Sequence, residues 1–273
     1  MFSPWYKFAR RGGRAADPAQ HCALNVALYG RGGKRWSMTE RGAGALARDS
    51  ENLHIGPSSL RWDGTALTVD FSEITAPIPT RIRGTLRLYP RGLATHQVAL
   101  DGVGKHRWSP LAPGAPVEVD LQSPALRWKG SAYFDTNAGD EPLEDAFIAW
   151  DWCRAPLDHG MAVLYHGHRR NGTEFCTALR YTPQGQAEPF EAPQAATLPR
   201  SFWRIPRATR CDPAATARVE KTLEDTPFYA RSLVSTGLLG QNVTAIHESL
   251  SLDRFVTPIV QFMLPFKAPR VLF

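Results

Sequence analysis

The segment 133–137, Tyr-Phe-Asp-Thr-Asn, carries the residue types whose spacing points most directly to chemistry. On a β-strand, Tyr133 and Asp135 lie on the same face because side chains alternate with a period of two. A carboxyl group beside an aromatic ring on an inward face is desolvated, and burial raises a carboxyl pKa by up to about 3–5 units. The segment therefore predicts a desolvated Asp135 with a raised pKa, and it is the leading candidate for a functional site. The residue types alone leave open a strand end where Asp135 accepts turn hydrogen bonds.

His106 and Trp108 have the same spacing in the sequence His-Arg-Trp. His106 can act as a general base, and Trp108 offers a π face to a developing cation. A histidine in a surface loop beside a packing tryptophan is the alternative. These two residues are therefore candidate members of an active site.

Trp150 and Trp152 flank Asp151 in the sequence Trp-Asp-Trp. On a strand both indoles share one face and Asp151 lies on the other. Such a pair is typical of a wall that binds an apolar ligand, and equally of core packing. We take both tryptophans as candidate substrate-binding residues.

A cluster of carboxylates follows the first segment, at Asp140, Glu141, Glu144 and Asp145. Two such carboxylates can hydrolyse a glycosidic bond. Because Pro142 lies among them, the start of a helix, where acidic side chains are favoured, is the better explanation.

His166 and His168 can place two imidazoles on one strand face as metal ligands. Spacing identifies no third ligand, so the sequence predicts no metal site. Its paired glycines do not form a phosphate-binding or dinucleotide-binding motif, and no nucleophile elbow occurs. We therefore expect no cofactor.

The elements that must position these residues are predominantly strands. Glycine and proline each number 22 among 273 residues, which disfavours a helical bundle or coiled coil. Alternating polar and apolar residues predict strands at 60–62, 66–71, 81–89, 117–121, 125–128, 147–152, 161–165 and 173–181. Asp63-Gly64 and Asn171-Gly172 are hairpin turn signals.

Only short helices are predicted, one opening at 141–145 and one over 228–236 after Thr226-Pro227. The fold class is therefore all-β, with two barrel-like or sandwich-like domains in series and a few short helices. We place the domains at residues 1–126 and 127–273, with the boundary within 122–131.

The net charge of +6 is spread along the chain and accompanies no recognisable nucleic-acid-binding module, so we expect no nucleic-acid partner. An anionic membrane surface suits such a diffuse charge. The chain start lacks the apolar core of a signal peptide, and no stretch is apolar enough to span a bilayer, which predicts a cytoplasmic protein. The four cysteines are widely spaced, as expected of reduced thiols. Residues 262–273 mix large apolar side chains with cations, which suits a membrane interface or, alternatively, a final packed strand.

Several sequence segments, spread over nearly the whole chain and found in the same order, resemble the carotenoid 1,2-hydratases, also called hydroxyneurosporene synthases. These segments are residues 21–30, 36–42, 55–64, 133–144, 223–232 and 247–255. The resemblance implies a double lipocalin-like β fold and a cofactor-independent lyase located at the inner photosynthetic membrane. This lyase adds water across the terminal 1,2 double bond of neurosporene, lycopene or a related acyclic carotenoid, and leaves a tertiary hydroxyl at C1.

The resemblance also implies site residues. In the family an aspartate donates the proton, with a tyrosine two residues before it and a His-x-Trp segment upstream. These positions match Asp135, Tyr133, His106 and Trp108. Two other functions are alternatives to hydration. The protein could be a non-catalytic carrier of a carotenoid or another hydrophobic ligand, or a glycosidase that uses the acidic cluster.

Overall fold

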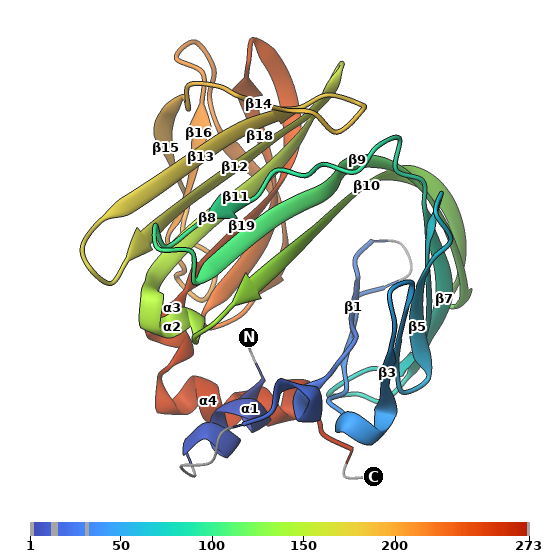
Figure 1. The fold of residues 1–273 in the computed structure, drawn as a ribbon. Coiled ribbons are helices and arrows are strands. Elements are labelled where there is room, and N and C mark those ends of the chain that lie inside the picture. The colour runs from blue at the N-terminus through green and yellow to red at the C-terminus, as the bar shows by residue number, and fades with distance from the viewer. Residues whose placement is uncertain (1–2, 12–15, 31–32, 272–273) are drawn as a thin grey trace. The chain divides into compact units, whose positions relative to one another are not determined.

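The computed structural model describes residues 3–11, 16–30 and 33–271. Antiparallel strands make up most of the described chain, and its helices are short (Figure 1). The predicted β-rich class is confirmed, whereas closure of the sheets into lipocalin-like barrels stays a prediction. The residues group into two compact units: the first comprises Met1–Pro90, Pro116–Ser131 and Gln261–Phe273, and the second comprises Arg91–Ala115 and Ala132–Val260. The division at residues 126 and 127 likewise stays a prediction.

The first unit is built on a sheet of successive antiparallel neighbours, in the order β3 to β7 followed by the end of β9 and the start of β10. Its elements are α1 (Pro4–Arg11), β1 (Asn25–Leu28), β2 (Arg35–Met38), β3 (Leu46–Arg48), β4 (Asn52–Ile55), β5 (Ser58–Trp62), β6 (Leu67–Ile74), β7 (Arg81–Leu88), parts of β9 (His106–Ser123) and β10 (Ala125–Gly139), most of α4 (Pro258–Lys267), and the 3₁₀ turns Pro18–His21 and Ala43–Ala45. The predicted β5–β6 hairpin is confirmed. Gly64 takes φ +90° in its turn, and Asp63 accepts the N–H groups of Thr65 and Ala66.

A buried carboxylate holds both ends of the chain within the first unit. Glu40 accepts hydrogen bonds from Ser3 and Arg270, and its Oε1 lies 2.8 Å from Nδ1 of His21. The indole of Trp5 donates to the carbonyl of Ala268 at 2.8 Å. These contacts place α1 beside the end of α4 (Figure 1).

The second unit contains a seven-stranded antiparallel sheet, in the order β14-β13-β12-β11-β19-β18-β17, and the two-stranded sheet β15-β16. Its elements are β8 (Val98–Ala99), parts of β9 and β10, α2 (Leu143–Ala146), β11 (Phe147–Leu157), β12 (Gly160–Arg169), β13 (Glu174–Tyr181), β14 (Ala187–Pro189), β15 (Gln194–Leu198), β16 (Arg207–Cys211), β17 (Arg218–Asp225), β18 (Tyr229–Leu238), β19 (Gln241–Ser251) and α3 (Leu252–Phe255). The strands predicted at 147–152, 161–165 and 173–181 and the short helix after Pro142 are confirmed.

The two faces of the seven-stranded sheet are covered by different kinds of side chain. One face carries small apolar residues such as Cys153, Ala155 and Ala245 in a buried cluster, and β16 contacts strands β11, β18 and β19. The other face carries tryptophan and tyrosine side chains that contact residues of β9 and β10. Alternation along β11 assigns Trp150 and Trp152 to the aromatic face and Asp151 to the reverse face.

The prediction of a helix over 228–236 is wrong, because this segment forms β18. Thr226 accepts the N–H of Tyr229 at 3.0 Å through its hydroxyl, as an N-cap residue does, but the chain then extends. From Tyr229 to Leu238 it pairs with β19 without a register shift. Long-range pairing therefore overrides the local capping signal.

The alternative of a packed final strand near the C-terminus is wrong for residues 258–267, which form helix α4. After the helix, Arg270 pairs with Glu40 in an isolated parallel β-bridge. Leu272 and Phe273, which belong to the same predicted interfacial stretch, lie outside the described residues. Within the described ranges, no helix combines the length and apolar character needed to cross a membrane.

We expect Gly160→Ala to destabilise the fold by about 1–3 kcal/mol. Gly160 ends the β11–β12 turn at φ +119°, and a Cβ there would lie 2.0 Å from the backbone carbonyl oxygen of Tyr181. Gly172 also has a positive φ, +81°, but a Cβ added there would meet no atom within 4 Å, so Gly172→Ala is the matched control. Thermal unfolding should show a larger fall for Gly160→Ala than for Gly172→Ala, and equal falls would contradict this packing argument.

Candidate active site

Asp135 lies on β10 and receives two side-chain hydrogen bonds from residues of the second unit. The indole Nε1 of Trp108, on β9, donates to Oδ2 of Asp135 at 2.8 Å. The hydroxyl of Tyr133 donates to the same oxygen at 3.1 Å. The structure therefore brings together three of the predicted site residues.

The direction of these hydrogen bonds assigns different roles to the two carboxyl oxygens. An indole N–H can only donate, and the Tyr133 hydroxyl donates to the oxygen that already accepts from Trp108. Oδ2 is therefore the oxygen that accepts from both side chains, and neither of these two donors contacts Oδ1.

Burial governs the protonation of Asp135. Desolvation raises the pKa of its carboxyl above the ordinary range, and this effect exceeds the lowering by the hydrogen bonds from Trp108 and Tyr133. The charge of Glu248 raises it further. Both features favour the neutral acid that the sequence predicted for this position.

Aromatic rings line the sheet next to this carboxyl. The ring of Tyr133 meets Trp152 edge to face at a centroid distance of 5.0 Å, and Trp108 meets Tyr165 at 5.3 Å. The ring centroids of Trp150 and Tyr165 are 6.0 Å apart. Trp150 and Trp152 thus share the face predicted for them, and together with Tyr165 they form an apolar wall.

Sequence reasoning missed Tyr165 and Phe175 of this wall. Tyr165 pairs with Trp152 across β11 and β12, and the rings of Tyr165 and Phe175 lie 5.5 Å apart. Gly167 on β12 is the strand partner of Phe175 on β13, and a Cβ on Gly167 would lie 2.3 Å from the Phe175 ring. The alternation in 161–165 indicated a strand, but strand register, which that pattern does not specify, brings these rings together.

His106, two residues before Trp108 on β9, is buried. The side-chain hydrogen bonds to the Asp135 carboxyl come from Trp108 and Tyr133, not from His106. Its ring lies 5.1 Å from that of Phe147, and its Nε2 has no hydrogen-bond partner. Glu141 is 3.8 Å from this nitrogen. Burial lowers the pKa of His106, so the imidazole is a neutral base.

A group of charged residues that the sequence analysis did not identify borders the aromatic wall. The guanidinium of Arg154 lies 5.9 Å from the centroid of the Tyr133 ring. Arg231 forms an ion pair with Glu248 at 2.8 Å, and Glu248 is the strand neighbour of Trp152.

The acidic cluster does not form a pair of facing carboxylates. Asp140 binds Arg107 at 3.0 Å, and Glu141 binds Lys105 at 2.6 Å. Glu144 and Asp145 lie in the first turn of α2, as expected from Pro142. This arrangement supports the helix-start interpretation of the cluster over the glycosidase hypothesis.

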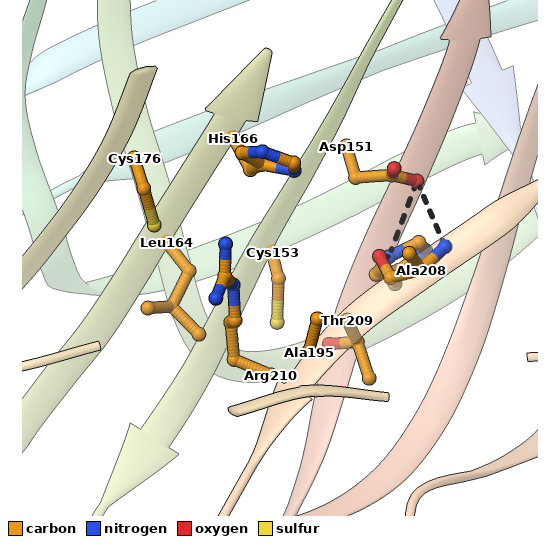
Figure 2. A pocket seen from close by; sticks show the side chains of 10 residues that line it. Asp151, Cys153, Leu164, His166, Cys176, Ala195, Ala208, Thr209 and Arg210 are labelled. Carbon is orange, nitrogen blue, oxygen red and sulfur yellow. Dashed lines mark hydrogen bonds and ion pairs between the residues drawn. The ribbon is translucent and has the colours of Figure 1, made fainter. Parts of the chain in front are cut away.

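A cavity of about 50 Å³ lies on the reverse face of the sheet, and its lining residues do not include Asp135 (Figure 2). Asp151 points into this region, where it accepts hydrogen bonds from Ser249 and from the N–H of Ala208. His247 is buried beside it, with Nε2 2.8 Å from the carbonyl of Ala208. The cavity is therefore separate from the aromatic wall.

The chain is similar to known proteins over nearly its whole length. The profile of the carotenoid hydratase CrtC family matches residues 1–272. An acyclic carotenoid 1,2-hydratase from Thiocapsa roseopersicina is 56% identical over 99% of this chain and 67% of its own length. The corresponding protein from Rubrivivax gelatinosus is 48% identical over the same shares.

Among solved structures, a protein named as an AttH from Nitrosomonas europaea has a TM-score of 0.54 and 13% identity. The match covers 81% of this chain and 77% of that one, and indicates similarity of fold alone. The sequence relatives carry the functional assignment, since they match this chain from end to end. The chain belongs to the carotenoid hydratase CrtC family, and its activity is that of an acyclic carotenoid 1,2-hydratase, a hydro-lyase.

Proposed function

We propose that Asp135 is the proton donor for hydration of the terminal 1,2 double bond of neurosporene, lycopene or a related acyclic carotenoid. The observation that carries this proposal is the convergence of two donors on one oxygen of a buried carboxyl. Oδ1 keeps the transferable proton, and the Trp108 and Tyr133 donors stabilise the carboxylate that forms as the proton leaves.

The reaction requires a strong and desolvated acid, because an isolated trisubstituted alkene is a poor base. Transfer of the proton from Oδ1 to C2 breaks the π bond and leaves a tertiary cation at C1. The π faces of Trp108 and Tyr133 can stabilise this cation by about 0.5–2 kcal/mol each. Placement of the acid and exclusion of bulk water contribute the larger part of the rate enhancement.

His106 is proposed to take a proton from the water that attacks C1. It lies on the same strand face as Trp108, two residues earlier on β9. Its neutral Nε2 has no partner and can accept this proton. Glu141, at 3.8 Å, can pass the proton on toward solvent, and Asp135 is reprotonated before the next turnover.

We also propose that α4 and α1 contact the membrane that holds the substrate. Phe262 and Phe266 are 71% and 62% exposed and pack against each other on α4, while Phe8 is exposed on α1. The last turn of α1 carries Arg10 and Arg11. Exposed aromatic rings beside cations fit the interface of an anionic bilayer.

Asp135→Asn should reduce turnover to no more than a few per cent while the protein stays folded. The amide keeps the shape and still accepts hydrogen bonds from Trp108 and Tyr133, but it has no proton acidic enough for an alkene. Anaerobic incubation with lycopene, followed by mass spectrometry for the gain of one water, measures the loss. Higher residual activity would remove Asp135 from the mechanism, and wild-type binding without a mass gain would indicate a carrier.

Tyr133→Phe should lower kcat roughly 10- to 150-fold, because one hydrogen bond to a developing carboxylate contributes about 1.5–3 kcal/mol. Tyr89→Phe is the matched control, since its hydroxyl donates to Glu118 at 3.2 Å in the first unit. Steady-state rates of the two variants provide the comparison. An equal effect in both would exclude a specific role for the Tyr133 hydroxyl.

Stability should depend on pH through Asp135. Its carboxyl has a raised pKa in the folded state and therefore binds more protons folded than unfolded, so its contribution weakens the fold as pH rises above the unfolded pKa. Asp135→Asn should be neutral or slightly stabilising at pH 7–8. Thermal melts from pH 5 to pH 9 test this, and a mutant markedly less stable at pH 8, with the gap closing toward pH 5, would identify Asp135 as an ionised structural residue.

The wild-type protein should float with anionic liposomes at low salt, and added salt should weaken the association. The double variant Phe262→Ser/Phe266→Ser should float less, because it removes exposed apolar area from α4. Phe202→Ser serves as control, since Phe202 is 87% exposed in the second unit. Failure of the wild type to float, or an equal loss in the control, would reject the interfacial role of α4.

A further inference from the structure

Three potential ligand groups converge on the reverse face of β12 and β13. His166 and His168 lie two residues apart on β12, and Glu174 is the strand partner of His168 on β13. Spacing along the chain did not reveal this third residue, because strand pairing brings it to the histidines. All three belong to the second unit.

The carboxylate of Glu174 binds one imidazole with each oxygen. Its Oε2 is 3.0 Å from Nε2 of His166, and its Oε1 is 3.1 Å from Nδ1 of His168. The two imidazole rings lie 4.9 Å apart, and the three ligand atoms are all within 4.8 Å of one another. Ligands on one tetrahedral ion at 2.0–2.2 Å would be about 3.4 Å apart, so small side-chain rotations bring all three into range.

The backbone that carries these groups is well supported. The β12–β13 turn contains Asn171 and Gly172, and the side chain of Asn171 accepts hydrogen bonds from the N–H and hydroxyl of Thr173. The guanidinium of Arg169 donates to the carbonyl of Leu100 and to the backbone carbonyl of Glu174, rather than to the Glu174 carboxylate. Ligands on paired strands are held more firmly than ligands on a loop.

We propose that His166, His168 and Glu174 form a binding site for a divalent transition-metal ion of the class that prefers imidazole nitrogen, such as Zn²⁺ or Co²⁺. Two imidazoles and one carboxylate on a single surface are a ligand set that this class of ion favours. The three residues leave a fourth position open. His166 also lines the reverse-face cavity together with Cys176, which is its strand partner (Figure 2).

This site is independent of the proposed hydration chemistry. Along β12, Tyr165 lies on the aromatic face and the two histidines lie on the opposite face. A bound ion would join β12 to β13 behind the aromatic wall. It would therefore stabilise the sheet without contacting the carotenoid.

The test uses the untagged full chain, treated with EDTA and dialysed, at pH 7.5. Calorimetric titration with Zn²⁺ should show one ion per chain, and Co²⁺ should give visible absorption bands of a tetrahedral site. Zn²⁺ should also raise the unfolding temperature in a concentration-dependent way. His168→Ala and Glu174→Gln should each weaken binding roughly tenfold or more.

His159→Ala is the matched control, because His159 is an exposed histidine in the β11–β12 turn. It should bind Zn²⁺ as the wild type does. Glu174→Gln keeps the size of the side chain, so it remains informative if His168→Ala fails to fold. Absence of saturable binding at one ion per chain, or unchanged affinity in Glu174→Gln, would overturn the proposal.

Discussion

Trp108 and Tyr133 both donate to the same oxygen of Asp135. The strand arrangement and aromatic packing of the second unit make this one-sided contact possible. Trp108 and Tyr133 must approach from one side of the carboxyl, which requires β9 and β10 to lie next to each other. Burial of the carboxyl outweighs these two hydrogen bonds to its charged form, so its pKa is raised. The aromatic wall provides this burial. Acid strength and desolvation are therefore set by the same packing.

The period of two along the central strands divides the second unit into two chemical environments. The face that carries Trp150, Trp152 and Tyr165 is rich in π surface and contacts the acid. The face that carries Asp151 and His166 borders a small cavity and adjoins a packed cluster of small residues. A one-residue shift of β11 would exchange these faces and place a carboxylate among the aromatic rings. Register is therefore as important for this site as residue identity.

The sequence predicted the local features of the molecule well, and the long-range ones poorly. Hairpins at Asp63-Gly64 and Asn171-Gly172, the shared face of Trp150 and Trp152, and the pairing of Tyr133 with Asp135 all depend on neighbouring residues. The partners that come from other strands, Tyr165, Arg154 and Glu248, depend on pairing that the sequence pattern does not specify. The error at β18 has the same origin, because Thr226 and Pro227 gave a helix signal that pairing with β19 overrode.

The two compact units exchange chain segments at β9 and β10. Each of these strands begins in one unit and ends in the other, so the stretch 116–131 of the first unit interrupts the sequence of the second. Trp108 and Asp135 lie on either side of this interruption, 27 residues apart. A fragment that starts after residue 126 would carry the acid without its indole donor, and a fragment that ends there would carry the donor without the acid. Under the proposed mechanism neither half is a self-sufficient catalyst, and activity from split chains would require the two fragments to reassociate through complementary strands.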